Sequence, residues 1–320
     1  MPHIISINGT DVALGETTRI DLQIAKLPTH TVIDLPVYIY RAPTDGPVLL
    51  ITAGLHGDEL NGVEIIRTLT ASKEIIPTMG TVLVIPVVNV YGFINNSRTM
   101  PDGRDLNRSF PGSKNGSLAA RIAHTLMNTV IPHIDYGVDL HTGGANQNYP
   151  QIRCTFDIEK NLELAKAFSP PFIVNSSLRD GSFRRETQKL GKTILVFEGG
   201  ESLRFDEITI KEGIEGVKRL MSYLGMNNSA FISNRETVII KKSSWIRANH
   251  SGLYRPFIDY GEEVKRNQII ATITDPYGET EYKLKSRFDG HVLAIRSSPI
   301  VNRGDAIVHI GTTNLDQEDD

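Results

Sequence analysis

Two histidines and a glutamate in this sequence have the types and placement that a catalytic metal site requires. His56 and Glu59 stand three residues apart, directly after the apolar run PVLLITA at 47–53. A catalytic zinc ion takes three protein ligands and keeps one position open for water. His141, which follows the short strand-like segment 137–140, offers a third ligand. The pattern indicates a two-histidine, one-carboxylate zinc site, although each motif alone is also typical of a solvated loop.

A carboxylate at the end of another apolar segment can act beside such a metal. Glu198 follows TILVF at 193–197 and precedes Gly199 and Gly200. A carboxylate next to a metal-polarised water can serve first as general base and then as general acid. The two glycines let the chain turn and leave space for a ligand. The alternative is a carboxylate that only caps a helix or turn.

The segment 97–112 is rich in proline, glycine and aspartate and carries three arginines, so we expect a loop. Arg108 beside Asn107 forms a plausible clamp for a substrate carboxylate, because a guanidinium binds carboxylate in bidentate fashion. Arg98 can polarise a carbonyl group. A solvated loop with internal aspartate–arginine pairs is the alternative, but long loops without secondary structure are often functional.

Four further residues carry weaker signals. Asp139 lies two residues before His141 and therefore on the same face of a strand, where it can orient a metal ligand or an active-site arginine. Cys154 has no base or glycine-rich turn beside it and is interpreted as a buried thiol. Arg184 and Arg185 begin a helix and can contact a substrate anion, but the pattern is more typical of surface charges.

The elements that must position these residues alternate between strands and helices. Apolar segments at 32–40, 47–53, 81–88, 137–140, 172–174 and 193–197 alternate with helical patterns at 61–70, 117–130, 162–168, 181–190 and 207–224. This alternation predicts an α/β fold with a mixed, mostly parallel sheet flanked by helices, whose site lies beyond the carboxyl ends of the strands. After about residue 229 the segments become short and turn-rich. We therefore expect a catalytic domain at 1–229 and a small β-rich domain at 230–320.

Composition narrows the class of protein. The 320 residues carry a net charge of −3 and one cysteine, without a basic patch, a signal peptide or an apolar run long enough to span a bilayer. We predict a cytoplasmic protein that acts on a small molecule rather than on nucleic acid or a membrane. The sequence is compatible with a homo-oligomer.

The order of these motifs resembles the succinylglutamate desuccinylase/aspartoacylase family, a branch of the zinc-carboxypeptidase-like fold. The similarity covers most of the first domain. The β-rich C-terminal domain also resembles the one in that family, and its pattern of short strands is typical of a barrel-sandwich hybrid. The motifs are His56-x-x-Glu59, Arg98, Asp105-Leu106-Asn107-Arg108, Asp139-x-His141 and Glu198-Gly-Gly.

The resemblance implies a role for each motif. His56, Glu59 and His141 hold one zinc ion per chain. Glu198 activates water and later protonates the leaving amine, and Arg98 stabilises the oxyanion.

Substrate binding is also implied. Asn107 and Arg108 bind a carboxylate of an N-acyl amino acid or similar small amide. The segment 101–103 departs from the family by an insertion, which puts Arg104 beside Arg98 as a candidate oxyanion stabiliser. We prefer Arg98.

Two other functions compete with this deacylase. A zinc carboxypeptidase would share the fold and the metal site and differ only in its pocket, so peptide cleavage assays discriminate between the two. A catalytically silent binding protein is the other alternative. The presence of both Glu198 and Arg98 beside the ligands argues against it. The C-terminal region has no lysine in its turn at 275–279, so we interpret it as a structural unit or a wall of the site rather than a carrier.

Overall fold

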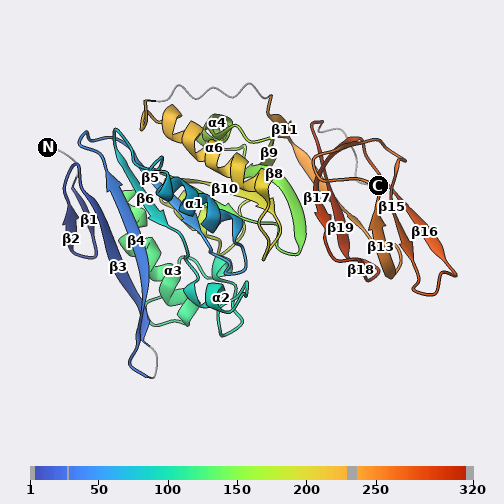
Figure 1. The fold of residues 1–320 in the computed structure, drawn as a ribbon, viewed down its shortest axis with the longest axis horizontal. Coiled ribbons are helices and arrows are strands. Elements are labelled where there is room, and N and C mark those ends of the chain that lie inside the picture. Colours follow the sequence, from blue (N-terminus) through green and yellow to red (C-terminus); the bar gives the residue numbers. More distant parts are fainter. Residues whose placement is uncertain (1–3, 27–28, 229–235, 315–320) are drawn as a thin grey trace.

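A computed structural model describes residues 4–26, 29–228 and 236–314, and Figure 1 shows their arrangement. The first half contains β1 (Ile5–Ile7), β2 (Thr10–Val12), β3 (Thr17–Lys26), β4 (Val32–Arg41), β5 (Val48–Ala53), α1 (Asn61–Ala71), β6 (Thr81–Ile85), α2 (Val90–Ile94), η1 (Leu106–Arg108), α3 (Leu118–Thr129), η2 (Ile131–His133), β7 (Tyr136–His141) and β8 (Asn146–Cys154).

In the second half of the chain, helices and strands alternate up to α6, and the elements described after α6 are strands only. This half contains α4 (Glu159–Phe168), β9 (Phe172–Asn175), α5 (Phe183–Lys189), β10 (Thr193–Gly200), α6 (Glu207–Tyr223), β11 (Val238–Ile240), β12 (Lys242–Arg247), β13 (Gly252–Pro256), β14 (Glu263–Val264), β15 (Ile269–Thr274), β16 (Glu281–Lys285), β17 (Gly290–Arg296), β18 (Ile300–Val301) and β19 (Ala306–Thr312).

The main sheet runs in the order β12-β19-β17-β8-β10-β7-β5-β6-β4-β3. Its centre, β10-β7-β5-β6, is parallel, whereas β4, β3, β8, β17, β19 and β12 pair antiparallel. The expected mixed α/β sheet is therefore present, but its parallel pairs are confined to this centre and to β9, which pairs parallel with β8 and with β11. The carboxyl ends of β5, β7 and β10 meet at one edge, which is where ligands bind in such sheets.

Helices cover both faces of the parallel centre, with α1, α4 and α6 on one side and α3 on the other (Figure 1). Leu49 and Ile51 of β5 pack with the first group of helices, while Val48 and Leu50 pack with α3. Alternate residues of a strand point to opposite faces, so a strand covered on both faces must be apolar throughout. This explains why the run at 47–53 has no polar position except Thr52.

The C-terminal strands extend the main sheet instead of standing apart from it. β17 pairs with β8, and β11 pairs with β9. A separate four-stranded sheet, β16-β15-β13-β18, packs beyond them at the right of Figure 1. All elements in the described part 236–314 are strands, as expected. The predicted boundary at residue 229 lies outside the described residues, so the division into two domains stays a prediction.

Most of the expected elements are confirmed, but the sequence did not indicate the short elements β1, β2, α2 and η2 or the two longer strands β3 and β8. The strand β8 follows His141 closely, and its sequence NQNYPQIRC lacks a clear apolar alternation. The strand β3, before the first expected segment, was also missed, although its apolar residues alternate. Among the described residues, no helix is long and apolar enough to cross a membrane.

Candidate active site

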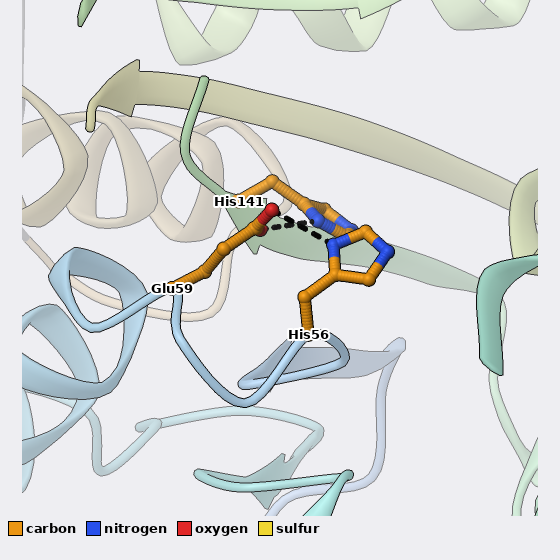
Figure 2. Close-up of side chains that lie close together, drawn as sticks. All are labelled: His56, Glu59 and His141. Carbon is orange, nitrogen blue, oxygen red and sulfur yellow. Dashed lines mark hydrogen bonds and ion pairs between the residues drawn. The ribbon is translucent and has the colours of Figure 1, made fainter. Parts of the chain in front are cut away.

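His56, Glu59 and His141 form one compact cluster at the carboxyl edge of the parallel strands (Figure 2). Nδ1 of His56 lies 2.8 Å from one oxygen of Glu59, and Nδ1 of His141 lies 2.8 Å from the other. All three side chains are buried. The two imidazoles therefore turn the same nitrogen toward a shared carboxylate, and these three residues could hold one metal ion.

An aspartate holds the opposite nitrogen of each histidine. Nε2 of His141 lies 2.7 Å from Asp139, and Nε2 of His56 lies 3.2 Å from Asp105. Thr52 donates a further hydrogen bond to Asp139. Carboxylate partners of this kind orient a ligating imidazole and raise its basicity. The expected orienting role of Asp139 has this geometry, and Asp105 is a partner that the spacing of residues did not identify.

The neighbouring charges within the cluster shift the pKa values of Glu59 and His141 in opposite directions. Burial alone raises the pKa of a carboxyl group, but His56 and His141 hold the pKa of Glu59 far below its usual range. Burial lowers the pKa of His141, yet the carboxylates of Asp139 and Glu59 outweigh it and raise that pKa well above its ordinary value. Glu59 is therefore ionised at neutral pH, and a metal that binds here displaces protons from the histidines.

The loop that carries His56 and Glu59 is held by close packing of glycine backbones. A Cβ atom at Gly57 would overlap the backbone of Gly92 and Phe93 in α2. Gly54 adopts a φ of 59°, in the left-handed region that favours glycine. These two positions let the chain leave β5 sharply and place both ligands over the sheet edge.

Glu198 lies on β10 opposite His141, in the neighbouring strand. Asn148 Nδ2 donates to it at 2.9 Å, and an Arg153 guanidinium nitrogen lies 3.4 Å away. Gly199 and Gly200 were expected to leave space for a ligand. They do not, because Thr209 fills the position beside Gly199 and Asn61 fills the position beside Gly200. They permit close packing of α6 and α1 instead.

The structure separates the two arginines that the sequence left as alternatives. Arg98 lies within 3.2 Å of Glu59 and 3.3 Å of His56 Nδ1, and it pairs with Asp105 at 3.0 Å. Arg104 is exposed and pairs with Asp102. Of the two, only Arg98 lines the pocket that contains the cluster.

Asn107 and Arg108 sit on the short helix η1, inside the segment expected to be an irregular loop. Asp105 caps this helix by accepting from Asn107 N. The Asn107 side-chain oxygen accepts from Phe183 N at 3.0 Å, so the NH2 group of the same side chain can donate to another partner. Both Asn107 and Arg108 line the pocket, and Arg108 is exposed, with one guanidinium nitrogen donating to the backbone oxygen of Asn107 at 2.6 Å.

The pocket measures about 280 Å³ and contains residues that sequence reasoning missed. Arg153 and Trp245 line it, from β8 and from the C-terminal strand β12. No local motif marks either residue.

The expectation that Arg184 is a surface charge is wrong. It lines the pocket and donates to the carbonyl oxygens of Arg153, Ser176 and Ser177. Burial lowers its pKa to about 10. Its neighbour Arg185 pairs with Asp180 instead.

Cys154 is 1% exposed, and burial raises the pKa of its thiol to about 12. Since a thiolate is the reactive form, this cysteine is unsuited to act as a nucleophile. The interpretation as a buried structural thiol agrees with its position.

Known proteins are similar to this chain in sequence and in fold. The chain is 28% identical over 293 residues to the N-alpha-acetyl-L-2,4-diaminobutyric acid deacetylase of Halomonas elongata, covering 86% of this chain and 85% of the relative. The product-bound ectoine utilization protein EutE (DoeB) of Ruegeria pomeroyi superposes with a TM-score of 0.83 at 22% identity, covering 97% and 99% of the two chains.

A Rhodobacter sphaeroides succinylglutamate desuccinylase/aspartoacylase superposes with a TM-score of 0.81 at 24% identity, covering 94% of this chain and 98% of that one. At these identities the superpositions show a shared fold. Residues 45–224 match the succinylglutamate desuccinylase/aspartoacylase catalytic domain, which is more than half of the chain. The protein therefore belongs to the succinylglutamate desuccinylase/aspartoacylase family of hydrolases.

Proposed function

We propose that this protein is a zinc-dependent amidohydrolase that removes the acyl group from an N-acyl amino acid. The observation that carries the proposal is the convergence of two histidine Nδ1 atoms on the two oxygens of Glu59, with Glu198 on the adjacent strand in register with His141. A structural cluster of ion pairs would not need a further carboxylate at the same end of the pocket.

The donor set fits zinc. The candidate ligand atoms of His56, Glu59 and His141 all lie within 4.8 Å of one another, and each histidine has an aspartate behind it. Two imidazoles and one carboxylate are the ligands of several catalytic zinc sites, although cobalt or manganese is compatible with the same set. When bound, zinc supplies a Lewis acid that polarises the amide carbonyl and acidifies a water molecule.

Glu198 has the position to move protons in this reaction. It takes a proton from the attacking water and delivers it to the nitrogen of the leaving amine. Asn148 and Arg153 contact its two carboxylate oxygens, so they hold the group in one orientation. The carboxylate that transfers the proton is thus held in position by two residues of β8.

Arg98 and Arg108 interact with two different negative groups, the oxygen that becomes charged during the reaction and the carboxylate of the substrate. Arg98 lies beside the ligand cluster and stabilises the negative oxygen that forms when water adds to the amide carbonyl. Arg108, with the side-chain amide nitrogen of Asn107, binds the carboxylate of the amino acid. The carboxylates of Glu59 and Asp105 offset the charge of Arg98, which otherwise would repel a metal ion.

The pocket favours a small anionic substrate over a peptide. Its volume of about 280 Å³ is at the lower end of ligand pockets in proteins. Among the described residues, arginines outnumber carboxylates in its lining, which suits a substrate with a negative charge. The curated relative from Halomonas elongata is named for removal of an acetyl group from an amino acid, in line with this chemistry.

Changing Arg98 to alanine should lower kcat by roughly 10²–10³-fold, the usual cost of removing one oxyanion donor. The matched change of Arg104 to alanine should leave kcat within about twofold, because Arg104 is exposed and pairs only with Asp102 among the described residues. Steady-state kinetics of both variants check this assignment. A large loss in the Arg104 variant with a silent Arg98 variant would reverse it.

The function itself is tested by metal content and by a substrate screen. We expect about one zinc ion per chain, and release of a free amino acid from N-acetyl, N-succinyl or N-formyl derivatives. Peptides with a free carboxyl end should not be cleaved. No metal, and no hydrolysis after zinc is added back, would contradict the proposal, and peptide cleavage would favour a carboxypeptidase.

A further inference from the structure

The pocket has one wall that comes from the C-terminal region. Trp245 on β12 lines the pocket that also contains His56 and Glu198, and it is the only residue of the described part 236–314 to do so. The indole is half-buried. It is also the single tryptophan of the chain. A substrate in the pocket can therefore meet an aromatic surface that belongs to neither the ligand cluster nor the arginine clamp.

The indole is held flat by its cross-strand neighbour. Trp245 and His309 are register partners in β12 and β19, and their rings stack with centroids 4.6 Å apart and an interplanar angle of 6°. His309 is 7% exposed, and burial together with the charge of Arg153 lowers its pKa to about 3. A neutral imidazole thus supports the back of the indole, so the ring presents a fixed face.

The sheet order places Trp245 at the opposite side of the pocket from the ligand cluster. His141 lies on β7 and Glu198 on the adjacent β10, whereas β8, β17 and β19 separate β10 from β12. Because Trp245 and Glu198 nevertheless line one pocket, the sheet curves between these strands, and the indole approaches the pocket from the β8 side of Glu198. Only a part of the substrate that extends past Glu198 on the β8 side can reach the indole.

We propose that Trp245 is a specificity-determining residue that closes the far end of the pocket and limits the length of the amino-acid side chain. This inference rests on the proposed function. Because Glu198 delivers its proton to the leaving amine, the amino-acid half of the substrate lies on the Glu198 side of the scissile bond. With the carboxylate bound by Arg108, the side chain is the part left to extend toward β12.

Intrinsic fluorescence tests whether the substrate reaches the wall. The zinc-loaded Glu198→Gln protein, chosen to slow turnover, is titrated with N-acyl derivatives of alanine, norvaline and norleucine that carry the acyl group hydrolysed best by the wild type. Since the chain has one tryptophan, emission that is excited selectively at the indole reports on Trp245 alone. We expect an emission change that grows with side-chain length. Unchanged emission at concentrations that calorimetry shows to be saturating would overturn the proposal.

Kinetics test whether the wall sets specificity. Trp245→Ala should raise the ratio of kcat/KM for norleucine over alanine derivatives by about tenfold, the lower range for one or a few methylenes in a pocket. Trp245→Phe, which keeps an aromatic face, should retain most of the wild-type ratio. Phe257→Ala removes an aromatic residue of the same region that is 57% exposed and lies outside the pocket lining, so its ratio should not change.

The outcomes separate the two proposals. If the wild type hydrolyses N-acyl amino acids but the ratio for Trp245→Ala stays within about twofold of the wild-type ratio, the role of Trp245 is wrong and the proposed function stands. If the wild type hydrolyses none of them, the proposed function fails and this inference fails with it.

Discussion

Replacing Glu198 with glutamine is expected to lower kcat by at least about a hundredfold while zinc stays bound, since general acid–base catalysis contributes roughly 10²–10⁴-fold. Glutamine keeps the size of the side chain and an oxygen that can accept from Asn148, but it cannot take a proton from water. Glu198 lies on the strand beside His141 and is not part of the three-residue ligand cluster. Metal analysis and steady-state kinetics on the same preparation measure both effects.

The matched control for this variant is Glu201→Gln. Glu201 lies three residues further along, pairs with Arg204 at 2.9 Å and is absent from the pocket lining. Its kcat should stay close to that of the wild type. A Glu198→Gln protein that hydrolyses its substrate at the wild-type rate would remove Glu198 from the reaction. A variant that loses its zinc would instead make Glu198 a metal ligand.

Replacing His56 with alanine should abolish both metal binding and activity. The two remaining ligands, Glu59 and His141, hold zinc poorly, because a catalytic site normally needs three protein ligands. The loss of affinity should exceed the roughly 10–100-fold that removal of an outer partner of a ligand costs. Zinc content after dialysis against a weak chelator, with the wild type treated in parallel, measures the change.

His124→Ala serves as the control for general effects of losing a histidine. His124 lies on α3, where its ring accepts from Asn128 at 3.1 Å, outside the ligand cluster. This variant should keep about one zinc ion per chain. Stoichiometric zinc in the His56→Ala protein would show that the ligand set proposed here is wrong, even if the site binds metal by other residues.

The sequence by itself predicted the parallel centre of the fold and the edge where the site lies. Strands covered on both faces must be apolar, so the run at 47–53 was recognisable without any knowledge of its neighbours. Helix α3 begins after Ser117 as expected, because the Ser117 side chain accepts from a backbone amide of the first turn. Local patterns of burial and capping suffice for such elements.

The sequence also predicted that His56, Glu59 and His141 lie close together. The reason is topological, since the carboxyl ends of adjacent parallel strands meet at one edge of a sheet. A residue that directly follows such a strand therefore lies at this edge. The same argument placed Glu198 beside His141, with which it is in register.

Only the tertiary structure decided which side chains complete the pocket. Asp105 contacts His56, which lies 49 residues away in the sequence. Arg184 donates to backbone carbonyl oxygens. Trp245 lies on β12, which is connected to the rest of the sheet through β19 and β17. None of these contacts leaves a local signal, because the same residue types also suit a solvated loop, a helix surface or a half-buried strand. Periodicity reports whether a position is buried, whereas the partner of a buried group depends on which distant strands become neighbours.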